Sequence, residues 1–364
     1  MKVLGIETSC DETAAAVVEL NSPTEGAILH SNEVLSSMDL HKAYGGVVPE
    51  IAARSHMEAI IPVIESALST AGCTWGDIDA IGVTYGAGLG GSLLVGVQTA
   101  KTLATLKQKP LYAINHVEGH IYANFIVGTS PKLQNMQAPY ALRQSTPSLP
   151  MLGLIVSGGH TQLVIWKDHF NYTLLGRTRD DAIGEAFDKV AKIIGLPYPG
   201  GPSIAKRALL GDDTKYRLPK AKLDTPYEFS FSGLKTAVLR LAQEIIGEDH
   251  TFASKNVAER LSDAQKSDIA ASFQRIAIQT VVDKCVLAFK EYKPKSVVIG
   301  GGVASSQELR KQLAERLPVD IAYTDPRLCT DNGAMIASLG CYSALLGQPT
   351  ADPMTLDIKP NLSM

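Results

Sequence analysis

The sequence predicts an α/β protein made of two similar domains that face each other across a ligand-binding cleft. Two strand–turn–strand segments, 2–18 and 152–165, align at a constant offset of 148 residues. At this offset the matched residues are Leu4 and Leu152, Gly5 and Gly153, Ser9 and Ser157, and Thr13 and Thr161. Each segment is followed later by a short buried strand, a glycine-rich loop and a helix. Because both units occur in the same order, they indicate an internal duplication.

The first half is expected to contain a strand pair, a long helix, and a third strand that leads through a glycine loop into a second helix. These elements are the strands Lys2–Ile6 and Ala14–Val18, the helix 47–68, the strand Asp79–Thr84, the loop 86–92 and a helix that ends at Leu106. In the helix 47–68, Met57, Ile60 and Ile61 belong to an apolar stripe with helical spacing, which predicts that they pack into the core.

The second half is expected to repeat this pattern and to add long helices. Its elements are the strand pair within Leu152–Ile165, a helix that opens near Asp180, a helix at 264–292, the strand Ser296–Ile299, a helix at 306–317 and the helix Ala334–Leu346. The predicted domains are therefore 1–126 and 151–345, with a proline-rich linker or insertion at 127–150 and a tail at 346–364.

Composition places the protein among ordinary globular proteins of a reducing compartment. The 364 residues are 45% hydrophobic and 20% charged, and the formal net charge of −3 means that a polyanion must be met by a local basic patch. The five cysteines form no CxxC motif, and neither a signal peptide nor a run near the ~20 apolar residues of a membrane helix is found. We therefore expect a cytoplasmic protein without membrane contact.

A histidine pair in the segment His116-Val117-Glu118-Gly119-His120 is the first candidate site. Residues four apart lie on one face of a helix, so His116 and His120 can share one metal ion. The order is H-x-E-x-H and not the H-E-x-x-H of zinc proteases, so Glu118 points away from the face that the histidines share. A solvated or core histidine pair is the alternative, and the segment alone leaves it open.

The third ligand of such a site is expected to be a carboxylate from a tight loop in the opposite half. A facial set of two histidines and one carboxylate, with open positions, suits Fe(II) or Zn(II). The candidate is Asp331, in the compact turn 329–333 before the helix Ala334–Leu346. The same residue could instead cap that helix, and the sequence does not decide between the two roles.

Glycine-rich turns at strand ends and helix starts favour anion binding. Their backbone N–H groups, and the positive end of the helix dipole, attract phosphate. Ordinary turns explain any single loop, whereas a matched set in both halves favours a phosphate-binding cleft. Asp188 lies beyond the first turn of its helix, where its carboxylate could accept hydrogen bonds from ribose hydroxyls, and the glycines before Pro202 would let a ligand approach the main chain.

Seven sequence blocks resemble the tRNA N6-adenosine threonylcarbamoyltransferase family. The blocks are GIETSCDETAAAV, NHVEGH, LIVSGGHTQLV, DDAIGEAFDKVAKIIGLPYPGGP, FSFSGLKTAV, GGGVASSQELR and CTDNGAMIA. They run in family order from Gly5 to Ala337, so the resemblance covers nearly the whole chain. It implies an actin-like fold, of the sugar kinase and Hsp70-type ATPase class, with two duplicated domains that face a nucleotide-binding cleft.

The resemblance also implies an activity and a set of site residues. The activity is transfer of a threonylcarbamoyl group from threonylcarbamoyl-AMP to N6 of adenosine 37 in tRNAs that read codons beginning with A, which gives t6A and AMP. The metal ligands would be His116, His120 and Asp331, with Fe(II) favoured over Zn(II). The residues that hold the adenylate would be Ile155, Val156, Ser157, Gly158, Gly159, Asp188, Gly201 and Ser306. The family usually has asparagine where Ser306 stands, and serine keeps one hydrogen bond where the amide makes two.

Asp11 and Glu12, in the turn of the first strand pair, are the candidate catalytic residues. An adenine amine is a poor nucleophile, so a metal acting as a Lewis acid is expected to polarise the carbamoyl carbonyl, while backbone N–H groups stabilise the leaving AMP. We expect Asp11 or Glu12 to orient the metal shell or to accept the amine proton. The alternative is that both residues only cap the turn.

RNA is expected to meet the densest basic run of the chain, which consists of Lys215, Arg217, Lys220 and Lys222. Such a run predicts contact with phosphates, with a solvated loop as the alternative. The substrate would be a tRNA anticodon loop, whose bases can be splayed into a protein cleft. The resemblance further implies an inactive paralogue that forms a heterodimer, a small P-loop ATPase of the same pathway, and a homodimer in isolation.

Three rival functions are disfavoured by the same residues. A metalloprotease needs a glutamate beside its first histidine, and the H-x-E-x-H order lacks it. A sugar or acetate kinase of the same fold uses Mg²⁺ and needs no paired histidines. The scaffold paralogue lacks the histidine pair that this chain carries.

Overall fold

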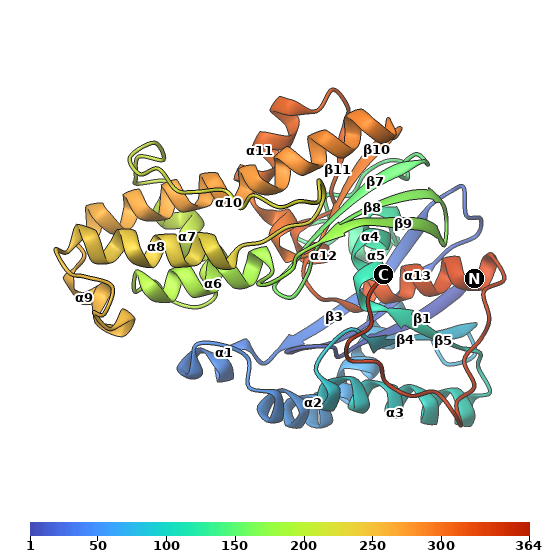
Figure 1. Ribbon diagram of the computed structural model, residues 1–364. Coiled ribbons are helices and arrows are strands. Elements are labelled where there is room, and N and C mark those ends of the chain that lie inside the picture. Colours follow the sequence, from blue (N-terminus) through green and yellow to red (C-terminus); the bar gives the residue numbers. More distant parts are fainter. The chain divides into compact units, whose positions relative to one another are not determined.

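Two mixed β-sheets organise the chain in the computed structural model, which describes residues 1–364 (Figure 1). Unit 1 comprises Met1–Pro147 and Ala322–Met364, and unit 2 comprises Ser148–Ile321. The strands of the first sheet are β1 (Lys2–Glu7), β2 (Glu12–Glu19), β3 (Ala27–Ser36), β4 (Ala80–Gly86), β5 (Leu111–Asn115) and β6 (Ile126–Thr129). Those of the second are β7 (Met151–Val156), β8 (Thr161–Asp168), β9 (Asn171–Arg177), β10 (Ser296–Gly300) and β11 (Ile321–Ala322).

Helices cover both sheets. Unit 1 contains α1 (Met38–His41), α2 (Pro49–Ala71), α3 (Gly90–Lys107), α4 (His116–Tyr122), α5 (Pro131–Gln134), α12 (Pro326–Cys329) and α13 (Gly333–Leu345), with the 3-10 helices η1 (Lys42–Tyr44) and η2 (Ala123–Phe125). Unit 2 contains α6 (Ile183–Ile193), α7 (Gly200–Ala208), α8 (Ser232–Ile245), α9 (Val257–Arg260), α10 (Asp263–Tyr292) and α11 (Gln307–Arg316), with η3 (Ser254–Asn256) and η4 (Gly302–Ser305). In unit 2, α6, α7, α8 and α10 pack together as a helical layer (Figure 1).

The two sheets repeat one topology, which confirms the duplication. The six-stranded sheet has the order β5-β4-β1-β2-β3-β6, and the five-stranded sheet has the order β11-β10-β7-β8-β9. Gly5 pairs with Ala16 between β1 and β2, and Gly153 pairs with Val164 between β7 and β8, so the register keeps the offset of 148 residues. A shift of one residue in the strand pairing would turn every buried side chain of a strand to the opposite face of the sheet. Because the two strand pairs keep the same register, equivalent positions are buried in both sheets.

Helix α13 belongs to unit 1, which corrects the predicted boundary 151–345. It packs against β1, β2 and β4, and most of its side chains are buried. A Cβ at Gly5 would lie 2.3 Å from the backbone nitrogen of Ala337, and one at Gly333 would lie 2.6 Å from the backbone of β2. An apolar helix must be covered on all sides, and the first sheet supplies that cover. Asp331 therefore lies in the same unit as the histidines and not in the opposite half.

The segment expected as a linker or insertion, 127–150, is held largely against unit 1. Strand β6 pairs with β3 at the edge of the first sheet. Arg327 donates hydrogen bonds to the backbone oxygens of Ala138 and Pro139, each at 2.9 Å, and its guanidinium lies 3.8 Å from the ring centre of Tyr140. These contacts join residues that are distant in sequence, so the local hydrophobic pattern of the segment does not predict them.

The C-terminal tail, 346–364, also packs on unit 1. The backbone N–H of Ala351 donates to the carbonyl of Leu111 at 2.7 Å, and that of Lys359 donates to the carbonyl of Tyr85 at 2.7 Å. The tail therefore crosses the β5 and β4 side of the first sheet.

Helix α2 exposes part of the stripe that was predicted to be core. Met57 is 62% exposed and Ile61 is 48% exposed, whereas Ile60 is 4% exposed. The buried face follows Ile60 and Ile64, and Met57 and Ile61 lie on a different face, so the prediction for these two residues is wrong. No helix of the structure combines the length and apolar character needed to cross a membrane.

Candidate metal centre and nucleotide-binding turn

The histidine pair lies on the short helix α4, as predicted. The side chain of Asn115 caps this helix by accepting a hydrogen bond from the backbone N–H of Val117 at 2.9 Å. The cap fixes the start of the helix directly after β5. His116 and His120 are 6% and 1% exposed, and their ring centres lie 4.7 Å apart. Both rings are therefore held side by side inside unit 1.

Asp331 reaches the same point from the loop before α13. Its Oδ1 lies 3.5 Å from Nε2 of His116 and 3.4 Å from Nε2 of His120. The helix cap that was its alternative role belongs to Asn332, whose side chain accepts a hydrogen bond from a backbone N–H of α13 at 3.0 Å. Gly119 allows the close approach of α13, because a Cβ there would lie 3.1 Å from Cδ1 of Ile336. Asp331 thus faces the histidines instead of capping the helix.

The three side chains fit a divalent cation. One ligand atom from each lies within 4.8 Å of the others. Two atoms that are each bound about 2.1 Å from one ion are separated by about 3–3.5 Å. Oδ1 of Asp331 lies at 3.5 Å and 3.4 Å from the two histidine nitrogens, close to this separation. His120 gives the sharper test, because neither of its buried ring nitrogens has a hydrogen-bond partner. A buried imidazole without a hydrogen bond is costly, and a metal ion at Nε2 would remove part of that cost.

Glu7 is a site residue that the sequence analysis did not identify. It ends β1, is completely buried, and accepts hydrogen bonds from the backbone N–H of Ser9 and the hydroxyl of Thr84, both at 2.5 Å. Its Oε2 also lies 3.2 Å from Nδ1 of His116. An acid at the end of an otherwise apolar strand was the available signal. Because Glu7 meets one ring nitrogen, the other nitrogen of His116 is directed toward Asp331.

Charges shift the titration of this cluster. Burial opposes the charged forms of Glu7 and His116, but the charge of His116 lowers the pKa of Glu7. Asp331 and Glu7 together outweigh the burial of His116 and raise its pKa to about 9. The site therefore favours positive charge at His116.

Asp11 lies in the turn between β1 and β2, and Glu12 is the first residue of β2. Burial, followed by the charges of Asp331 and Asp11, raises the pKa of Glu12 to about 9. The hydroxyl of Ser36 donates to Glu12 at 3.3 Å, and the backbone oxygen of Asp11 accepts from the N–H of Ser37 at 2.9 Å. Glu12 thus lies in the electrostatic neighbourhood of Asp331 and Asp11, where a cation would relieve the repulsion between the carboxylates.

The turn between β7 and β8 carries the predicted adenylate residues of unit 2. Ile155 and Val156 are buried at the end of β7, and the backbone N–H of Ser157 closes the turn by donating to a carbonyl three residues later at 2.8 Å. Gly158 and Gly159 are exposed, and a Cβ on either would meet no atom within 4 Å. Open backbone of this kind can approach an anion closely.

Asp188, Gly201 and Ser306 have local roles that leave room for a ligand. Oδ1 of Asp188 accepts a hydrogen bond from the backbone N–H of Gly200 at 2.6 Å, at the start of α7. Burial raises the pKa of Asp188, and this N–H opposes the shift. A Cβ at Gly201 would meet no atom within 4 Å. Ser306 caps α11 by accepting from the N–H of Leu309 at 3.4 Å, and its hydroxyl can still donate one hydrogen bond.

The basic run predicted to contact RNA is partly neutralised by an acid. Nζ of Lys220 lies 2.6 Å from Oδ2 of Asp283, and Arg316 binds the other oxygen of that carboxylate at 2.6 Å. Lys215 and Lys222 are exposed in the loop between α7 and α8. The run is therefore less concentrated in positive charge than its sequence spacing indicates.

The fold and the site together define an actin-like protein that carries a candidate metal centre. The structure resembles full-length HypF in its phosphate- and nucleotide-bound form, with a TM-score of 0.54 and 15% sequence identity. The match covers 95% of this chain and 46% of HypF. At that level of identity the likeness supports the fold alone.

Sequence comparison then identifies the family. A family model for tRNA N6-adenosine threonylcarbamoyltransferase matches residues 28–338. The relative of that name from Thermomicrobium roseum is 46% identical over 371 residues, covering 100% of this chain and 97% of the relative. The relative from Symbiobacterium thermophilum is 47% identical over 343 residues, covering 93% and 91%. The chain belongs to the tRNA N6-adenosine threonylcarbamoyltransferase family of transferases, and the resemblance seen in the seven sequence blocks is confirmed.

Proposed function

We propose that this chain transfers the threonylcarbamoyl group from threonylcarbamoyl-AMP to N6 of adenosine 37 in the anticodon loop of tRNAs that read codons beginning with A. The products are t6A and AMP, and the reaction takes place in the cytoplasm. Membership of the transferase family carries the reaction type. The observation in the structure that supports it is the convergence of His116, His120 and Asp331 on one point.

The metal centre in this proposal holds one divalent ion, Fe(II) in preference to Zn(II), through His116, His120 and Asp331. When bound, the ion would supply Lewis-acid polarisation of the carbamoyl carbonyl. Glu7 would keep His116 in the tautomer that presents Nε2, because Nδ1 lies 3.2 Å from the Glu7 carboxylate. The open positions that catalysis needs follow from a set of only three protein ligands.

The adenylate in this proposal is held by unit 2. The exposed backbone at Gly158 and Gly159 donates to its phosphate, after Ile155, Val156 and Ser157 have fixed the end of β7. Asp188 would accept from ribose hydroxyls through the oxygen that Gly200 leaves unused. Gly201 and Ser306 would line the remaining edge, the first with bare backbone and the second with its hydroxyl. As AMP leaves, the same N–H groups would stabilise its charge.

Asp11 and Glu12 are proposed to orient the metal shell or to accept the proton that the adenine amine releases. The supporting observation is that the charges of Asp331 and Asp11 both act on Glu12. A Glu12→Gln variant removes one acceptor while keeping the size of the side chain. Full single-turnover transfer by this variant would exclude Glu12 as the proton acceptor.

The test of the proposed function is an assay with threonylcarbamoyl-AMP and unmodified tRNA. We expect the wild-type chain to form t6A, and His116→Ala to lose at least about 1000-fold in rate together with its metal content. The exposed His250 provides the matched control, since His250→Ala removes a histidine outside the cluster. Wild-type rates and wild-type metal content in His116→Ala would contradict the role of the metal centre. Absence of any transfer by wild type in the presence of its partners would contradict the function.

The partner proteins of this proposal are an inactive paralogue that forms a heterodimer and a small P-loop ATPase, with a homodimer in isolation. Exposed apolar side chains on α1, η1 and α2 support a protein contact there; they are Leu40, Tyr44, Met57 and Ile61, which are 56%, 64%, 62% and 48% exposed. We expect Met57→Glu/Ile61→Glu to abolish co-elution with the paralogue in size-exclusion chromatography. Unchanged co-elution would remove this face from the contact.

A further inference from the structure

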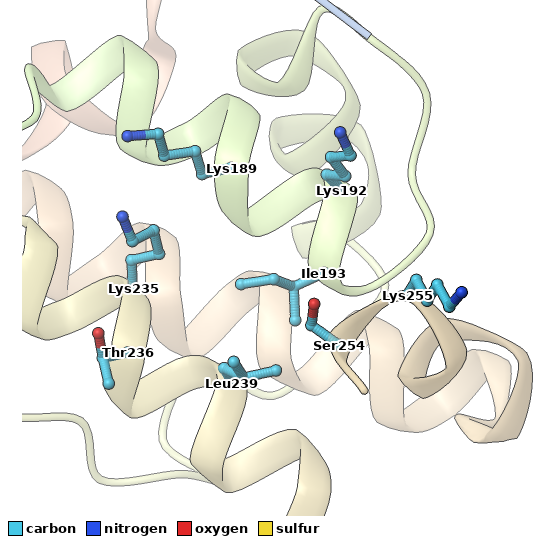
Figure 2. Close-up of a pocket in the computed structure, with 8 residues that line it drawn as sticks. All are labelled: Lys189, Lys192, Ile193, Lys235, Thr236, Leu239, Ser254 and Lys255. Atoms are coloured by element: carbon cyan, nitrogen blue, oxygen red, sulfur yellow. The ribbon is translucent and has the colours of Figure 1, made fainter. Parts of the chain in front are cut away.

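A cavity of about 340 Å³ opens in unit 2 between α6, α8 and η3 (Figure 2). Lysines contribute four of its eight lining residues, Lys189 and Lys192 from α6, Lys235 from α8 and Lys255 from η3, and no lining residue is acidic. We call this set the lysine pocket. Ile193 and Leu239 supply its apolar lining. Four ammonium groups around one cavity raise the local potential, so the pocket is suited to an anionic ligand.

The four lysines fall into two pairs with different roles. Lys189 and Lys235 both bind Asp181, with Nζ to carboxylate distances of 2.6 Å and 3.0 Å, and Lys189 also lies 2.8 Å from Glu185. These bonds tie α6 to α8 and fix two ammonium groups in place. Lys192 and Lys255 are exposed and have no ion pair. Two carboxylates therefore face four lysines, and the positive charge of Lys192 and Lys255 is left for a ligand.

The place of the lysine pocket on α6 relates it to the adenylate turn within the same unit. The backbone N–H of Gly184, in the first turn of α6, donates to the carbonyl of Ser157 at 3.2 Å. Lys192 lies eight residues further along the helix, which corresponds to about 12 Å at 1.5 Å per residue. A ligand in the lysine pocket is thus separate from an adenylate at the turn, but a chain molecule with several phosphates could extend from one to the other.

We propose that the lysine pocket binds backbone phosphates of the tRNA substrate, on nucleotides that flank the adenosine to be modified. The inference rests on the proposed function for the identity of the polyanion. The protein has a net charge of −3, so it must meet RNA through a local patch, and the run at 215–222 gives part of its charge to Asp283. The apolar lining accommodates a ribose, and the hydroxyls of Thr236 and Ser254, which also line the pocket, can donate to phosphate oxygens.

The test measures binding of unmodified tRNA to the full chain with its partners at several salt concentrations. Lys192→Glu/Lys255→Glu changes only the two lysines without ion pairs, so the bonds between α6 and α8 stay intact. We expect the double variant to bind tRNA at least about tenfold more weakly. The slope of log affinity against log salt should fall by about 1.4, since each phosphate contact on single-stranded RNA contributes about 0.7. At saturating tRNA the rate of transfer should be close to that of wild type.

The matched control is Lys290→Glu/Lys295→Glu, which reverses two exposed lysines of unit 2 outside the pocket. This control should keep wild-type affinity within about twofold. Equal weakening by both double variants would show an effect of net charge alone and would overturn the proposal. Wild-type affinity and salt slope in Lys192→Glu/Lys255→Glu would overturn it as well, as would a large loss that occurs only in Lys215→Glu/Lys222→Glu. If wild type binds tRNA through the pocket and yet transfers nothing, the proposed function fails while this inference stands.

Discussion

The turn after β1 and the turn after β7 occupy equivalent places in the duplicated fold and carry opposite chemistry. At the offset of 148 residues, the positions of Glu7, Cys10, Asp11 and Glu12 in unit 1 are taken by Ile155, Gly158, Gly159 and His160 in unit 2. Ser9 and Ser157 are the same residue in both. The first turn gathers carboxylates near two histidines, and the second exposes bare backbone N–H groups.

Under the proposed function, this difference lets one backbone frame serve a cation in one copy and an anion in the other. The strands need the same register and the same buried faces in both units, so duplication preserves them. The residues between the paired strands, such as Cys10 and Asp11 in unit 1 and Gly158 and Gly159 in unit 2, take no part in the strand pairing, so they can differ between the units. Acids there would attract a metal ion, and glycines there would attract a phosphate.

The largest effect is expected when an acid of the turn in unit 1 is introduced into the turn of unit 2, because this removes the difference between the two turns. Gly159→Asp gives unit 2 the residue that Asp11 supplies in unit 1, and it fits because a Cβ at Gly159 meets no atom within 4 Å. A like charge 4 Å from a phosphate is worth up to about 4 kcal/mol near a protein surface, so we expect AMP to bind about 100-fold more weakly by calorimetry. Gly159→Asn has a similar size without the charge, and equal losses in the two variants would contradict the electrostatic explanation.

A variant of Glu7 tests the same comparison of the two turns in unit 1. The counterpart of Glu7 in unit 2 is Ile155. Glu7→Gln keeps the shape of the side chain and weakens the acceptor that meets Nδ1 of His116. We expect the dissociation constant for Zn(II), measured by chelator competition, to rise about 10–100-fold. Glu19→Gln, on the neighbouring strand β2, is the control and should bind the ion as wild type does. An unchanged constant in Glu7→Gln, with an unchanged melting temperature, would exclude an orienting role.

We expect the smallest effect at Asp283, a carboxylate that forms ion pairs and lies outside the two turns. Burial opposes its ionisation, but the hydrogen bonds from Lys220 and Arg316 lower its pKa. A lowered pKa in the folded state stabilises the protein above the unfolded pKa of about 3.9, and this stability is lost as the pH falls through the folded pKa. The carboxylate is 39% exposed, so screening limits the effect to about 0.5–1 kcal/mol. Urea unfolding should show Asp283→Asn less stable by that amount at pH 7 and equal to wild type near pH 2; a difference that persists at pH 2 would refute this linkage.

Local pattern was enough to predict the duplicated frame and the place of the histidine pair. Strand alternation and glycine loops recur at a fixed offset, and spacing of four residues places His116 and His120 on one helical face. The same reasoning assigned Met57 and Ile61 to the core, because an apolar period does not say how wide the buried face is.

The rest of the site depends on contacts between residues that are distant in sequence. In the structure Asn332, and not Asp331, caps α13, because the side chain of Asn332 reaches a backbone N–H at the start of the helix. Glu7 looked like a strand end, and only the packing of β1 against α4 reveals its contact with His116. The chain likewise returns to unit 1 at residue 322 because α13 buries its apolar side chains against the first sheet.

That return has a consequence for the order in which the protein becomes functional as it is made. The two histidines leave the ribosome more than 200 residues before Asp331, which at 5–20 residues per second is a delay on the order of 10–40 s. During that interval the nascent chain has Glu7 and the histidine pair but not Asp331, and the face of its first sheet that α13 will cover is bare. The candidate metal centre and the first unit as a whole are therefore completed together and late, after the second unit has already been translated.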